Sequence, residues 1–125
     1  MILDTHALSG WADGDRELER VLAAQEVLAL PVIVLGEYRF GLSGSKLQRA
    51  LEPKLAELER LVRVLDITRS TAQIYAVIRA ELKRSGTPIP SNDTWIAALA
   101  REHQLRIISR DAHFDLVAGI KRIGW

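Results

Sequence analysis

Short apolar segments alternate along this chain with longer segments in which apolar residues recur every three or four positions. The longer segments have the periodicity of helices that bury one face. The short segments are candidates for buried strands, at residues 1–3, 27–30, 63–67, 106–109 and 121–123. Strands that alternate with helices predict an α/β fold with a central, mostly parallel sheet of four to five short strands. Because the chain has 125 residues, we expect one domain spanning residues 1–125.

Prolines and hydroxyl residues mark the ends of several expected helices. The helices are expected at residues 5–11, 15–24, 31–41, 46–62, 72–85 and 91–103, with one helical turn at 114–117. Pro31 suits the first turn of its helix, whereas Pro53 should kink or divide the helix that contains it. Ser91 or Asn92 is expected to cap the helix that ends at residue 103.

The composition limits the chemistry available to the chain. The absence of cysteine excludes disulfides, thiolate zinc sites and cysteine nucleophiles. The 17 basic residues nearly balance the 16 acidic ones, so the overall charge gives no evidence for or against a nucleic-acid partner. The longest apolar stretch, residues 27–36, is too short to span a bilayer, and the N-terminus does not resemble an export signal. We therefore expect a cytoplasmic protein without a membrane segment.

Four acidic residues have apolar neighbours, which is unusual because charged side chains normally lie in solvent. Asp4 and Asp111 follow expected strands, and ligands of parallel sheets collect beyond the carboxyl ends of the strands. Glu37 lies among apolar residues within an expected helix, and Asp93 opens an almost wholly apolar helix. Capping can explain Asp4 and Asp111, and the helix dipole can explain Asp93, but a mid-helix glutamate has no capping role.

A divalent cation is a common way to satisfy several buried carboxylates together. Since the chain offers no thiolate, a site made of oxygen ligands favours a hard ion such as Mg²⁺ or Mn²⁺. The four acids are therefore candidate metal ligands.

Four segments carry a family resemblance. Residues 2–8, 34–41, 92–98 and 108–114 resemble, in order and spacing, the acidic motifs of PIN domains, and the chain is most similar to the VapC-type toxin ribonucleases. This resemblance implies a three-layer sandwich and an endoribonuclease that depends on Mg²⁺, with Mn²⁺ as a possible substitute. Carried over residue by residue, the catalytic and metal-binding acids would be Asp4, Glu37, Asp93 and Asp111.

The resemblance also implies supporting residues and partners. Thr5 and Ser109 match small hydroxyl positions that would orient a carboxylate or water, although each can equally be a local cap or turn former. The implied partners are an RNA substrate (a tRNA or rRNA), a cognate antitoxin and a second copy of the chain. Arg39 and Arg110 lie beside the acidic motifs and are assigned phosphate contacts on that proximity.

The histidines and one further acid are assigned no catalytic role. His6, His103 and His113 are too scattered along the sequence for a metal triad. His6 and His113 each lie two residues from a proposed ligand, but metal-bound water needs no histidine base. Asp115 is expected at the surface of the last helical turn.

Two competing protein classes are excluded because this chain lacks acidic residues that they require, and a third class remains open. A receiver domain requires a pair of acids after the first strand, and a haloacid-dehalogenase-type phosphatase requires an aspartate two residues after the first, where this chain has His6. A PIN-like module that binds RNA or protein without cutting is the remaining alternative, and four intact acids argue against it. Whether the apolar faces at 31–38 and 47–61 pack internally or form a dimer stays open.

Overall fold

A five-stranded parallel sheet forms the centre of the molecule in the computed structural model, which describes residues 1–25 and 27–125. Its strands stand in the order β3-β2-β1-β4-β5, and every neighbouring pair is parallel. Their bounds are β1 (Ile2–Leu3), β2 (Ala29–Pro31), β3 (Arg63–Leu65), β4 (Ile107–Ile108) and β5 (Arg122–Ile123). The predicted α/β fold with a parallel sheet of short strands is confirmed.

The register of the central strands places two chain segments at one edge of the sheet. Leu3 of β1 pairs with Ile108 of β4, so Asp4 and Ser109 both leave the sheet at the carboxyl ends of neighbouring strands. These strands are fully buried, as expected of parallel strands covered on both faces. The rigid centre of the sheet therefore positions the two segments relative to each other.

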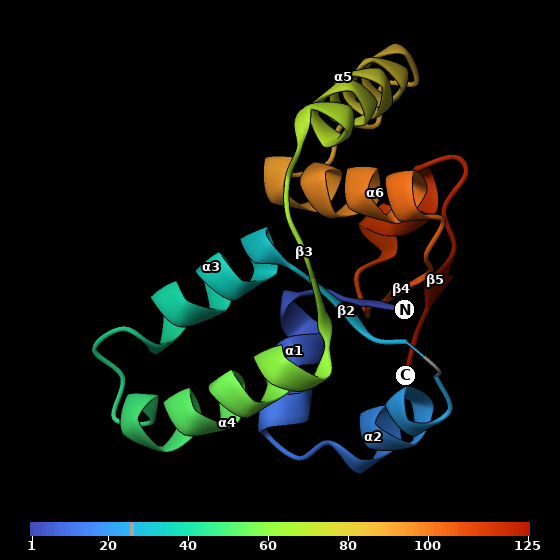
Figure 1. Cartoon of the computed structure of the whole chain (residues 1–125). Coiled ribbons are helices and arrows are strands. Elements are labelled where there is room, and N and C mark those ends of the chain that lie inside the picture. Colours follow the sequence, from blue (N-terminus) through green and yellow to red (C-terminus); the bar gives the residue numbers. More distant parts are fainter. Residues whose placement is uncertain (26) are drawn as a thin grey trace.

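Helices cover both faces of the sheet, which confirms the three-layer arrangement (Figure 1). On one side lie α1 (Thr5–Ala12), α2 (Arg16–Ala23) and α4 (Gln48–Leu61). On the other side α5 (Arg69–Arg84) packs on α6 (Ser91–His103). Helix α3 (Val32–Leu42) leaves β2 and contacts both α1 and α6, and the short η1 (Ala112–Leu116) contacts α6.

Two expectations about prolines are corrected. Pro31 is the last residue of β2 and the N-cap of α3, so it precedes the first helical turn. Pro53 was expected to kink or divide its helix, and it does not divide it, because α4 runs through Pro53 as one helix. Burial of Leu55 and Leu58, with Leu51 packed at the edge of the core, offsets the hydrogen bond that Pro53 cannot donate.

The expected side-chain cap of α6 is also wrong. Ser91 and Asn92 lie within the helix, and Pro90 occupies the N-cap position without a side-chain cap hydrogen bond. Prolines 88 and 90 favour extended backbone up to the helix, which then begins at the next residue. The Thr94 amide and hydroxyl both donate to the Pro90 carbonyl, at 3.0 and 3.1 Å.

The apolar face at residues 47–61 is only partly buried in the core. Leu55 and Leu58 are buried, whereas Leu47 and Leu61 near the ends of α4 are 58% and 75% exposed. Phe40 on α3 is 83% exposed. Within residues 1–25 and 27–125, no helix has both the length and the apolar character to cross a bilayer.

Candidate active site

The Asp4 carboxylate is buried and held on both sides. It follows β1 and caps α1, where its Oδ1 accepts a hydrogen bond from the Ala7 amide at 2.8 Å. Its Oδ2 accepts a hydrogen bond from the Ser109 hydroxyl. Only 3% of the residue is exposed, and burial raises the pKa of Asp4 although both hydrogen bonds act to lower it. The acid therefore caps a helix with one oxygen and faces the neighbouring strand with the other.

Ser109 connects the first and last acids. It follows β4 and is fully buried, and besides donating to Asp4 its hydroxyl accepts a hydrogen bond from the Asp111 amide at 2.9 Å. Its carbonyl accepts from the Arg122 guanidinium at 3.1 Å. These contacts are those of a residue that orients both acidic segments, whereas its part in catalysis stays a prediction.

Glu37 brings a carboxylate from α3 to the same edge of the sheet. The Thr5 hydroxyl donates to its Oε2 at 3.4 Å. Its Oε1 is buried and has no hydrogen-bond partner in the described part of the chain. A buried polar oxygen without a partner is costly unless something outside the protein satisfies it.

Asp93 and Asp111 meet at His113. Asp93 lies in the first turn of α6, and Asp111 precedes η1, where its Oδ1 accepts from the His113 amide at 2.9 Å. The His113 Nδ1 lies 3.1 Å from Asp111 Oδ1 and 3.8 Å from Asp93 Oδ2. One ligand atom from each of the three residues lies within 4.8 Å of the others, which is close enough to hold one metal ion.

The pKa of Asp93 shows that all four predicted acids share one electrostatic environment. Burial, followed by the negative charge of Asp111, raises the pKa of Asp93 from 3.8 to about 6. Asp4 and Glu37 raise it further, while His113 opposes the shift. Carboxylates that destabilise each other's charged forms in this way are arranged for a cation.

The donor set fits a divalent cation. Asp4, Glu37, Asp93 and Asp111 offer carboxylate oxygens, of which Glu37 Oε1 is buried without a partner among the described residues, and His113 offers an imidazole nitrogen. Hard ions such as Mg²⁺ prefer the oxygens, and transition-metal ions also accept imidazole.

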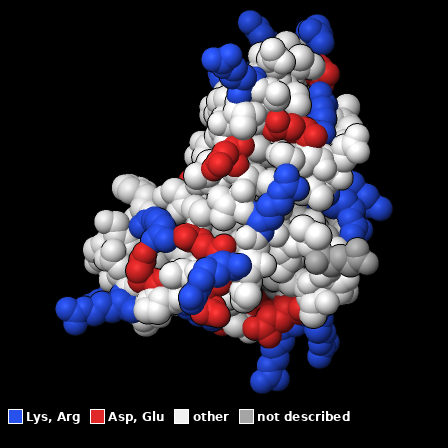
Figure 2. Space-filling view, viewed as in Figure 1, with Lys and Arg blue, Asp and Glu red and all other residues white. Residues whose placement is uncertain are grey.

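One of the two arginines that were assigned phosphate contacts, Arg39, already has acidic partners. Arg39 binds Glu52 and Glu59 of α4, the latter at 2.7 Å, and both contacts raise the pKa of Arg39. Figure 2 likewise shows basic and acidic side chains interspersed over the face that it presents. Asp115 pairs with Arg122 at 2.8 Å. The phosphate contact assigned to Arg39 stays a prediction. The alternative role of Arg39 is to hold α3 against α4 through its ion pairs with Glu52 and Glu59.

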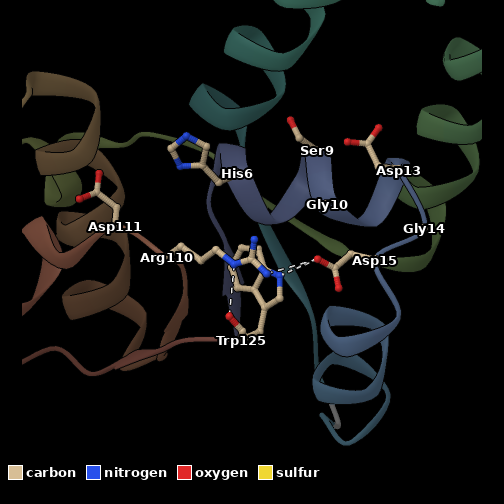
Figure 3. A pocket seen from close by; sticks show the side chains of 9 residues that line it. All are labelled: His6, Ser9, Gly10, Asp13, Gly14, Asp15, Arg110, Asp111 and Trp125. Atoms are coloured by element: carbon tan, nitrogen blue, oxygen red, sulfur yellow. Dashed lines mark hydrogen bonds and ion pairs between the residues drawn. The ribbon is translucent and has the colours of Figure 1, made fainter.

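A cavity of about 520 Å³ adjoins the acids (Figure 3). His6 and Asp111 line its end beside the acids, and the Arg110 guanidinium lies over the Trp125 ring on another wall, 4.5 Å from the ring centroid. His6 Nδ1 is 4.0 Å from Asp4 Oδ2. Neither Trp125 nor His113 was assigned a role from the sequence, because no local pattern indicates which distant segments these residues meet.

Comparison with known proteins agrees with this geometry. Residues 1–120 match the PIN domain family, and the chain therefore belongs to that family. Ribonuclease VapC5 of Mycobacterium tuberculosis is 31% identical over 94% of this chain and 87% of its own length.

Solved structures give the same result. The crystal structure of FitAcB from Neisseria gonorrhoeae superposes with a TM-score of 0.87 and 28% identity, covering 98% of this chain and 95% of the other. VapBC-5 from Mycobacterium tuberculosis, of the VapBC family of toxin-antitoxin systems, superposes with a TM-score of 0.73 and 27% identity, covering 99% and 97%.

Proposed function

We propose that this chain is a divalent-metal-dependent endoribonuclease and the toxin component of a toxin–antitoxin pair. The observation that carries the proposal is the convergence of four carboxylates at one edge of the sheet, where they act on the pKa of Asp93 and leave Glu37 Oε1 without a partner. Membership of the PIN family and similarity to VapC ribonucleases support the reaction class. The proposed substrate is a tRNA or rRNA.

The proposed cofactor is Mg²⁺, with Mn²⁺ as a substitute, held by Asp4, Glu37, Asp93 and Asp111. When bound, the ion lowers the pKa of water and neutralises charge on the phosphate. The carboxylates supply the negative charge that binds the ion, and Ser109 keeps Asp4 in place through its hydroxyl. Thr5 does the same for Glu37 at 3.4 Å. Because Asp4 is buried, its orientation needs no rearrangement before the reaction.

The decisive experiment incubates the purified chain with total cellular RNA in Mg²⁺, Mn²⁺ or chelator and maps new RNA ends. Asp4→Asn is the matched control, because an asparagine oxygen still accepts the Ala7 hydrogen bond and preserves the cap. Discrete cuts that need metal and are lost in the control are expected. A folded, antitoxin-free, metal-binding chain that cuts nothing would favour the non-catalytic binding module.

We further propose that the chain forms a homodimer, binds a cognate antitoxin and acts in the cytoplasm. The exposed apolar side chains of Phe40 on α3 and of Leu47 and Leu61 at the two ends of α4 leave apolar surface on these helices that a protein partner would cover. Relatedness to a member of the VapBC toxin-antitoxin family supports the antitoxin. Mass measurement in solution, alone and after co-expression with the product of the neighbouring gene, tests both, and cell fractionation tests the location.

A further inference from the structure

Most of the side chains that line the cavity beside the acids are not among the proposed metal ligands. One wall is the face of α1 that carries His6, Ser9 and Asp13, which are spaced three and four residues apart and so share a helical face (Figure 3). Its volume of about 520 Å³ lies within the range of roughly 300–1,000 Å³ that small-molecule sites occupy. Asp111 lines one end of the cavity, so a substrate phosphate held at the acids would lie beside it.

The opposite wall carries the planar guanidinium cation of Arg110, which hydrogen bonds to Asp15 and Trp125 hold in place. Asp15 caps α2 through Oδ1, and its Oδ2 accepts from the Trp125 indole at 3.1 Å and from Arg110 at 3.4 Å. The Arg110 Nε also donates to the Trp125 carbonyl at 3.2 Å. Because the Arg110 side chain is still 55% exposed, one face of its guanidinium is available for stacking. Unpaired RNA bases stack on such guanidinium planes and on aromatic rings.

Gly10 permits the close approach of α1 to Leu18 and to the Trp125 ring. A Cβ at Gly10 would lie 2.9 Å from Leu18 Cδ2 and 3.6 Å from the Trp125 ring. A side chain there would displace the buried Leu18 side chain of α2, whereas the approach to Trp125 is an ordinary van der Waals contact. Glycine at this position therefore allows α1 to pack closely against Leu18 beside the cavity.

Asp13 lies at a position where a negative charge does not stabilise the fold. It is the C-cap of α1, at the negative end of the helix dipole. No hydrogen bond or ion pair engages its carboxylate within the described part of the chain, and it lines the cavity. Asp13 lies seven positions after His6 along α1, a separation of about 10 Å at roughly 1.5 Å per residue.

We propose that this cavity receives the base of one unpaired nucleotide next to the scissile phosphate, and that Asp13 selects guanine. A carboxylate only accepts hydrogen bonds, and guanine alone presents two adjacent donors, N1–H and the N2 amino group, on its Watson–Crick edge. Adenine and cytosine place an acceptor beside their amino group, and uracil flanks its single donor with acceptors. This inference rests on the proposed ribonuclease function and extends it to substrate selection.

The test measures binding and cleavage separately. Short uridine oligomers with G, A, C or U at the central position are titrated into the chain in chelator, with tryptophan fluorescence as the signal. We expect the G oligomer to bind at least about tenfold more tightly than the others, as one bidentate contact allows. Asp13→Asn should abolish that preference without loss of melting temperature, while the matched control Asp66→Asn, an exposed loop acid, should retain it.

Trp125→Phe is a second variant that keeps a ring beside Arg110 but removes the indole donor to Asp15. It should weaken binding of all four oligomers alike and leave the preference for G. Equal affinity for the four oligomers, or a G preference that survives Asp13→Asn, would overturn the proposal. In Mg²⁺, cleavage without any base preference would refute the pocket and keep the nuclease, whereas Asp13-dependent G binding without cleavage would do the reverse.

Discussion

Two groups of acids in this molecule have opposite surroundings. On α4, Glu52 and Glu59 face the Arg39 guanidinium, and the pKa of Arg39 is raised because each charge stabilises the other. At the sheet edge, burial and then the negative charge of neighbouring carboxylates raise the pKa of Asp93 to about 6, because both disfavour its charged form. The first group contributes to folding without a ligand, and the second is costly until a cation binds. Mutations should therefore act in opposite directions at the two places.

The largest expected effect is on cleavage. Replacing Asp4 by Asn should lower RNA cleavage in Mg²⁺ by at least about a hundredfold, because the variant loses a buried negative charge from the metal centre. Rates on a mapped RNA substrate measure the loss. Retained cleavage, with the same ends and metal dependence, would remove Asp4 from the catalytic set.

The next effect is on stability and has a defined pH window. Because the pKa of Asp93 is about 6 when folded and about 3.9 unfolded, the folded state binds the proton more tightly. The free energy of unfolding in chelator should therefore fall as the pH rises from about 4 to 6 and then level off. Asp93→Asn should remove this loss and raise stability at pH 7 by about 2 kcal/mol, somewhat less than the full shift because the side chain is 22% exposed.

Urea unfolding at pH 5 and pH 7, with and without metal, measures this effect. The same variant should lose most of the stabilisation that Mg²⁺ gives the native chain, since it removes a ligand. A destabilised Asp93→Asn in chelator would show that the acid stabilises the fold, as the helix dipole alone would predict.

A smaller effect is expected at His113, whose Nδ1 lies with the carboxylates of Asp93 and Asp111. His113→Asn should weaken Mn²⁺ binding about tenfold and Mg²⁺ binding less, because imidazole suits transition-metal ions better than hard ones. Calorimetric titration of both ions measures the difference, and His103→Asn, at the far end of α6, is the control. An equal loss for both ions would assign His113 to positioning Asp111 only.

The smallest effect is expected on α3. Arg39→Gln should cost at most about 1 kcal/mol of stability, because both ion pairs are partly exposed. Thermal melts and cleavage rates are compared with Arg60→Gln, which removes an exposed ion pair with Glu57 within α4. A marked fall in cleavage for Arg39→Gln alone would support its predicted contact with the RNA phosphates, whereas unchanged cleavage would leave Arg39 only its ion pairs with Glu52 and Glu59.

Much of the fold was predictable because its signals are local. Apolar runs and helical periodicity indicated the five strands and six α-helices that the described residues form. The errors at Pro53 and Pro90 arose where packing or backbone geometry outweighed a residue's usual preference. Helix caps and prolines are weak signals when a buried face decides the outcome.

The sequence by itself determined which acids are out of place among apolar neighbours, because burial follows from local pattern. Only the tertiary structure decided what those acids meet. The pairing of β1 with β4 joins Asp4 to Ser109 across 105 positions, α6 brings Asp93 to His113, and the chain end places Trp125 against Asp15. Such contacts depend on sheet register and helix packing, which are properties of the whole chain and leave no mark in any one segment.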